Sequence, residues 1–109
     1  MKVSHVHCVV QELVEALDWF EKVWGVKASF TNGRMAELPL GQFSLMLDVG
    51  QSDSKVTIGF HSGNCDLDYQ TVIERGAISI EPPLDRPWGV RAAYIKGPGA
   101  LTLEIEQPL

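Results

Sequence analysis

Two histidines near the start of the chain are placed to act on one ligand. His5 and His7 are two residues apart in Val3–Val10, a Val-rich stretch that predicts a strand. Side chains two apart on a strand point to the same face, so the two imidazoles can share one metal ion. Such groups are more often solvated or paired with each other, and that alternative stays open. Cys8 is one residue out of phase and points to the opposite face.

Trp88 differs from the other aromatic residues by its surroundings. It follows the proline-rich stretch Glu81–Pro87 and precedes a predicted strand. An indole at such a place can stack on a flat ligand, or it can anchor the loop on the sheet. No glycine-rich phosphate loop, dinucleotide fingerprint or local signature of a nucleophile accompanies it. Both roles of Trp88 therefore stay open.

Composition narrows the class of protein. The chain has 109 residues, 45% hydrophobic residues and a formal net charge of −5. This length predicts one compact domain, and the negative charge argues against nucleic-acid or anionic-membrane partners. With only two cysteines, Cys8 and Cys65, no disulfide scaffold is expected, which fits a reducing cytoplasm. We also expect no leader peptide and no membrane-spanning stretch.

The chain repeats itself. Module one, about residues 1–50, and module two, about 55–109, align over three pairs of segments and are joined by the polar link Gly50–Ser54. Either half alone is of marginal size, so both should pack as one domain, residues 1–109. The aligned segments are Leu17–Phe20 with Leu67–Gln70, Arg34–Leu38 with Arg91–Ile95, and Phe43–Asp48 with Leu101–Glu106.

Local patterns predict the same β-α-β-β-β order in each module. Helical spacing of apolar residues ends at Gly25 and Gly76, and Asn32-Gly33 is a strong hairpin signal. Glu81–Pro87 contains three prolines and is expected to be a loop. The predicted fold is α+β, with two helices covering two curved antiparallel sheets and a cleft on the other faces. The predicted helices are Glu12–Trp24 and Asp66–Arg75, and the strands are Val3–Val10, Val26–Thr31, Arg34–Leu38, Phe43–Val49, Lys55–His61, Ala77–Ile80, Val90–Ile95 and Leu101–Glu106.

The order of these motifs resembles the vicinal oxygen chelate superfamily, which includes glyoxalase I, extradiol dioxygenases and bleomycin and fosfomycin resistance proteins. The first module carries the resemblance in His5–Leu13, then Trp19-Phe20 and Trp24-Gly25. The second carries it in Pro87-Trp88-Gly89, followed by Arg91, Gly97-Pro98 and the last strand. The resemblance covers nearly the whole chain and implies the two-module fold.

Metal-dependent members of that superfamily place one ligand on the first and last strand of each module. The resemblance maps these positions to His5, Met46, Thr57 and Glu104. Imidazole and carboxylate suit a borderline or hard divalent ion, whereas a thioether and a neutral hydroxyl do not. His5 and Glu104 then form at best an incomplete metal site, or they are hydrogen-bonded residues of the cleft.

Strand alternation offers a shifted site as an alternative. If the four mapped positions face the cleft, other residues at the same phase face it too. A site from His5 and His7 with Glu104 or Glu106 follows from that geometry. The further residues at this phase are His7, Asp48, His61 and Glu106.

We therefore expect a glyoxalase/bleomycin-resistance-like protein that binds a small organic molecule in its cleft without an intact catalytic metal site. The alternatives are a metal-dependent lyase, isomerase or dioxygenase of the same superfamily, and a non-enzymatic partner module. No cofactor is expected beyond a weakly held divalent metal. Exposed strand edges favour a homodimer. The expected ligand-binding residues are His7, Met46, Asp48, Thr57, Trp88 and Glu106.

Overall fold

The computed structural model describes residues 3–109, so residues 1–2 of the first predicted module lie outside the described part. The chain divides into two compact units. The first contains residues up to Ser54 together with Pro98–Ala100, and the second contains Lys55–Gly97 and Leu101–Leu109. The division at Ser54 falls at the end of the predicted link between the modules. That both halves fold as one domain stays a prediction.

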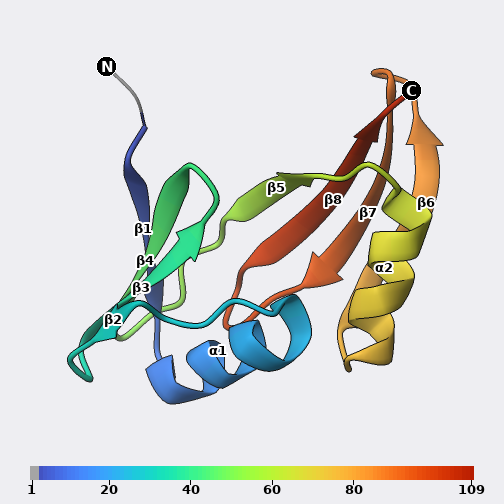
Figure 1. Ribbon diagram of the computed structural model, residues 1–109. Coiled ribbons are helices and arrows are strands. Elements are labelled where there is room, and N and C mark those ends of the chain that lie inside the picture. Colours follow the sequence, from blue (N-terminus) through green and yellow to red (C-terminus); the bar gives the residue numbers. More distant parts are fainter. Residues whose placement is uncertain (1–2) are drawn as a thin grey trace. The chain divides into compact units, whose positions relative to one another are not determined.

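Within residues 3–109, each unit holds a four-stranded sheet and an α-helix (Figure 1). The first unit contains β1 (His5–Val10), α1 (Leu13–Trp19), the π-helical turn η1 (Phe20–Trp24), β2 (Phe30–Thr31), β3 (Met35–Leu40) and β4 (Phe43–Val49). The second unit contains β5 (Thr57–His61), α2 (Cys65–Glu74), β6 (Ile78–Arg86), β7 (Val90–Lys96) and β8 (Thr102–Pro108).

Both sheets have the same strand order, β1-β4-β3-β2 in one and β5-β8-β7-β6 in the other. This equivalence confirms the internal repeat and its β-α-β-β-β order. The prediction of antiparallel sheets is wrong in one respect, because β1 pairs with β4 and β5 pairs with β8 in parallel. The first strand of each unit joins the last one rather than its sequence neighbour, so each sheet is mixed.

The first helix is less regular than its apolar spacing suggests. The predicted helix Glu12–Trp24 is α-helical only to Trp19 and continues as the π-helical turn η1. The wider turn still buries Phe20 and Val23. Gly25 ends it in the left-handed conformation, with φ of 74°, as predicted.

The strand predicted at Val26–Thr31 is mostly absent, because only Phe30–Thr31 pairs with β3. The hairpin at Asn32-Gly33 is confirmed by this antiparallel pair. The Asn32 side-chain oxygen accepts hydrogen bonds from the backbone N–H groups of Arg34 and Met35. An Asn side chain that satisfies backbone donors in this way holds the turn together.

The loop predicted at Glu81–Pro87 is wrong. Strand β6 continues through Pro82-Pro83 to Arg86. Proline lacks an N–H donor, which excludes it from the middle of a sheet but not from an edge strand or a bulge. Strand β6 lies at the edge of its sheet, and its register shifts between Ser79 and Leu84, so both conditions hold.

Each helix packs on one face of its own sheet, α1 against β4 and α2 against β6, β7 and β8. Asn64 caps α2 by accepting a hydrogen bond from Leu67 N, as short polar residues do at helix starts. Both cysteines, Cys8 and Cys65, are buried free thiols in these helix-covered cores. Within residues 3–109, no helix is long and apolar enough to span a membrane.

Candidate functional site

The sheet of the first unit has two chemically different faces. Buried and more accessible side chains alternate from His7 to Val10 in β1 and from Ser44 to Asp48 in β4, as the period of two in strands requires. Cys8, Leu45 and Leu47 are fully buried on the helix-covered face. Burial, and secondly the charge of Asp48, raise the pKa of the Cys8 thiol, which makes it a core residue rather than a nucleophile. The opposite face, called here the first open face, carries His5, His7, Met46 and Asp48.

The predicted residues on the first open face form a connected group. His7 Nδ1 lies 2.7 Å from Asp48 Oδ2, and His5 Nδ1 lies 2.7 Å from the Ser4 hydroxyl. The two imidazoles meet edge to face, with ring centroids 5.0 Å apart. Met46 is the register partner of His7 on the neighbouring strand. The predicted pairing of polar groups and the predicted spacing on one face are therefore both present.

The sheet of the second unit carries the other predicted residues on its own face away from α2, called here the second open face. Thr57, Gly59 and His61 alternate along β5 with more buried residues. Glu104 lies opposite Gly59, and Glu106 lies opposite His61. His61 Nδ1 and Glu106 Oε1 are 3.9 Å apart, which is a loose contact between two accessible side chains.

Glu104 is held by its neighbours. The Tyr94 hydroxyl donates a hydrogen bond of 2.9 Å to Glu104 Oε2. A side chain at Gly59 would meet Glu104 Oε1, since a Cβ there would lie 3.3 Å from that oxygen. Burial, followed by the hydrogen bond to Glu104 and its charge, raises the pKa of Tyr94. The phenol therefore stays a donor to the carboxylate over the ordinary pH range.

Arg86 continues this chain of contacts toward the edge of the sheet. Its Nη1 forms an ion pair of 3.0 Å with Glu81, and its Nη2 donates a 2.9 Å hydrogen bond to the Ala92 carbonyl. The guanidinium lies 5.3 Å from the centroid of the Tyr94 ring, within range of a cation–π interaction. The side chain is only 12% exposed, and its Nε is buried without a hydrogen-bond partner. A charged group is thus fixed at the second open face.

A pocket of about 380 Å³ lies at this place. Trp88, in the turn between β6 and β7, is 63% exposed, so it does not anchor the turn by burial. Of the residues predicted from sequence, only Trp88 lines the pocket. The sequence gives no signal for the fixed pair Arg86 and Tyr94, because the prolines before Arg86 indicate a loop and conceal the pairing of β6 with β7. The lining residues are Ile80, Glu81, Arg86, Trp88, Tyr94 and Thr102.

The four mapped metal positions fit a hard or borderline divalent ion poorly. His5 and Met46 belong to the first unit, and Met46 brings a neutral thioether. Thr57 and Glu104 belong to the second unit. One oxygen of Glu104 is already engaged by Tyr94, and Thr57 brings a neutral hydroxyl. Two good donors out of four leave most of the coordination sphere to water.

The shifted metal site draws on the same two units. His5 and His7 lie together in the first unit, and Glu104 and Glu106 lie in the second. Among residues 3–109, no three His, Cys, Asp or Glu side chains gather closely enough to hold a metal ion. A site shared by these four residues stays a prediction.

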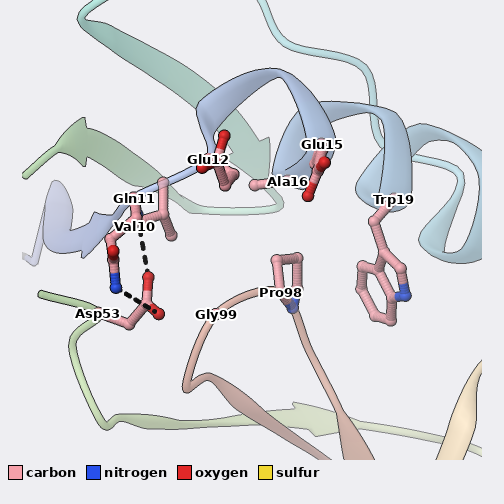
Figure 2. Close-up of a pocket in the computed structure, with 9 residues that line it drawn as sticks. All are labelled: Val10, Gln11, Glu12, Glu15, Ala16, Trp19, Asp53, Pro98 and Gly99. Atoms are coloured by element: carbon pink, nitrogen blue, oxygen red, sulfur yellow. Dashed lines mark hydrogen bonds between the residues drawn. The ribbon is translucent and has the colours of Figure 1, made fainter.

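A second pocket, of about 390 Å³, lies in the first unit on the helix side and contains none of the predicted site residues. Figure 2 shows Pro98 facing α1 near Trp19, and Gln11 joined to Asp53 by two hydrogen bonds. Gly99 permits this close approach, because a Cβ at its φ of +59° would lie 2.8 Å from Asp53 Oδ1. The sequence pattern of a single strand or helix cannot reveal this pocket, because the pocket forms between α1 and two loops. Its other lining residues are Val10, Glu12, Glu15 and Ala16.

Comparison with known proteins shows which solved structures share this fold. The sequence matches no protein-family model and no curated protein. Solved structures, however, match over the whole chain. A glyoxalase/bleomycin resistance protein/dioxygenase from Nocardioides has a TM-score of 0.87 and 19% identity, covering 100% of this chain and 84% of that chain. TioX from Micromonospora sp. ML1 has a TM-score of 0.84 and 18% identity, covering 100% of both chains.

A third similar structure is a member of the glyoxalase/bleomycin resistance protein/dioxygenase superfamily from Sphaerobacter thermophilus DSM 20745. Its TM-score is 0.82, with 23% identity over 98% of this chain and 97% of that chain. At such identities the likeness concerns the fold, while the side chains of the sites differ freely. The predicted resemblance is thereby confirmed at the level of the fold. The chain has the fold of the glyoxalase/bleomycin resistance protein/dioxygenase superfamily.

Proposed function

We propose that this protein binds a small organic molecule at the second open face, without catalysis by a divalent metal. The observation that supports this proposal is the pocket beside Trp88, with its volume of about 380 Å³. Ligand sites of small molecules typically have about 300–1,000 Å³ and combine apolar walls with a few fixed polar groups. This pocket has both kinds of lining.

The lining favours a flat ligand. Trp88 and Ile80 are 63% and 52% exposed, so they offer apolar surface that a ring can cover. Arg86 and Glu81 form a fixed ion pair at the same place, and polar groups of this kind orient a ligand. The names of similar structures include bleomycin resistance proteins, which supports a role in binding organic compounds.

Nuclear magnetic resonance with a flat probe tests this proposal. We expect 2-naphthol to shift the Trp88 indole N–H signal and the amides of β6 and β7, and decahydro-2-naphthol, its saturated counterpart, to shift them much less. Trp88→Ala should remove the effect. Leu84→Ala is the matched control, because Leu84 is an exposed apolar residue of β6 outside the pocket.

Shifts confined to the pocket of the first unit, or equal shifts in Trp88→Ala, would contradict the proposal.

We also propose a cytoplasmic homodimer. Both sheets end in edge strands, β2 and β6 among them, and exposed edges favour pairing. Sedimentation at micromolar concentration tests the dimer, and a stable monomer would refute it.

A further inference from the structure

Three side chains that can act as donors to a soft metal ion share the first open face. His5 and His7 are two residues apart on β1 and share this face, with their rings in edge-to-face contact. Met46 lies opposite His7 on β4, on the same face. All three come from paired strands of one sheet, which are among the more rigid supports for a site. This group belongs to the first unit alone and is independent of the Trp88 pocket.

The hydrogen bonds of His5 and His7 engage Nδ1 of each ring and leave Nε2 available. A carboxylate only accepts hydrogen bonds, so His7 Nδ1 carries the proton that it shares with Asp48 at 2.7 Å. In the neutral imidazole, the lone pair is then on Nε2. Ser4 contacts Nδ1 of His5 at 2.7 Å, and its hydroxyl can accept from that nitrogen as well as donate to it. Histidines that ligate metals usually have their other nitrogen engaged in this way.

The donor types select the ion. Two imidazoles and a thioether are neutral, soft to borderline ligands, and a thioether favours copper(I) over zinc or manganese. With three neutral donors, a monovalent cation brings a single positive charge. The carboxylate of Asp48, held against His7, lies beside the group to balance that charge. A site of this composition suits a soft monovalent ion better than a hard divalent one.

We propose that His5, His7 and Met46 form a copper(I) site on the first open face. This set differs from the four positions that the superfamily uses, because it replaces the ligands of the second unit by His7. The His7 side chain is 51% exposed, so copper(I) can reach the group from solvent or from a donor protein.

The test is an anaerobic titration with copper(I) alone, in competition with a chromophoric copper(I) chelator. We expect one ion per chain, and about tenfold or greater weakening in Met46→Leu and in His7→Gln. Met46→Leu conserves volume at a half-buried position, so it should fold, and circular dichroism verifies this. Copper X-ray absorption should show a sulfur neighbour in the unmodified protein that is lost in Met46→Leu.

Two control variants make the test specific. Met35→Leu removes the thioether opposite Asp48 on the same sheet, and His61→Gln removes an exposed imidazole of the second unit. Both should keep the affinity for copper(I). Equal affinity in Met46→Leu and the unmodified protein would overturn the proposal, and so would absence of copper(I) uptake or tighter binding of zinc. The 2-naphthol experiment reports separately on the second unit.

Discussion

Removing the Tyr94 hydroxyl tests the geometry of the second open face most directly. In Tyr94→Phe, Glu104 loses the 2.9 Å hydrogen bond at one of its oxygens. A hydrogen bond to a charged group contributes about 1.5–3 kcal/mol when it is buried. Both residues are half-buried, so water can replace part of the lost interaction. We therefore expect a loss of about 1–1.5 kcal/mol in the free energy of unfolding.

Urea denaturation at neutral pH measures this loss. With a slope of about 1–2 kcal/mol per molar urea, the midpoint should fall by roughly 0.5–1.5 M. Tyr69→Phe is the control, because Tyr69 is a half-buried tyrosine of α2 outside the contacts described for Tyr94. This control should leave the midpoint nearly unchanged.

The raised pKa of Tyr94 fixes the sign of the pH dependence. A group whose pKa is higher in the folded protein stabilises the fold below its unfolded pKa, about 10 for tyrosine. That stability is lost as pH rises through the folded pKa. The difference between the unmodified protein and Tyr94→Phe should therefore shrink in alkaline solution. In Glu104→Gln, ultraviolet titration should place the pKa of Tyr94 lower but still raised, since burial is its largest cause.

An unchanged urea midpoint in Tyr94→Phe, together with an unchanged tyrosine titration in Glu104→Gln, would refute this reasoning. Glu104 would then be free of Tyr94 and available as a ligand.

Two further predictions concern other parts of the molecule. Gly76→Ala should cost about 1 kcal/mol in denaturant unfolding, because this glycine has a φ of 102° after α2, and an unchanged midpoint would contradict it. Arg91 lowers the pKa of Asp66 through hydrogen bonds of 2.8 and 3.0 Å, so Arg91→Lys should lower the melting temperature at neutral pH. A lowered folded pKa stabilises above the unfolded value, so this effect should fade below about pH 4, and a pH-independent effect would contradict it.

Much of the fold could be predicted because it rests on local signals. Period-two alternation located most strands, and apolar helical spacing located both helices. Gly25 and Gly76 have positive φ just beyond the helices, where the repeat placed them. Parallel pairing of β1 with β4 could not be predicted in this way. Pairing partners depend on contacts between distant segments, which the pattern of a single strand does not contain.

The β6 segment shows how tertiary position can override local preference. Pro82-Pro83 indicates a loop in isolation, because proline cannot donate a ladder hydrogen bond. At a sheet edge with a bulge, that missing donor costs little. The site depends on this strand, because Arg86 contacts Glu81 and Tyr94 from a β6 that is paired with β7. Trp88 can be singled out from sequence because an aromatic residue beside prolines is a local feature, and its role in binding a ligand stays a prediction.

Met46 decides which kind of metal ion the first open face suits, a hard divalent ion or copper(I). The resemblance leads to a charged or hard metal ligand at this position. The Met46 thioether is neutral and soft instead, so the donors around His5 carry less negative charge and suit a softer ion. The same change that weakens a divalent site strengthens a soft one, provided that a second imidazole is near. The register between β1 and β4 places this second imidazole, because His7 lies opposite Met46 and shares a face with His5. Restoring a carboxylate by Met46→Glu should therefore move the preference of this face from copper(I) toward zinc, and loss of copper(I) binding should accompany gain of zinc binding.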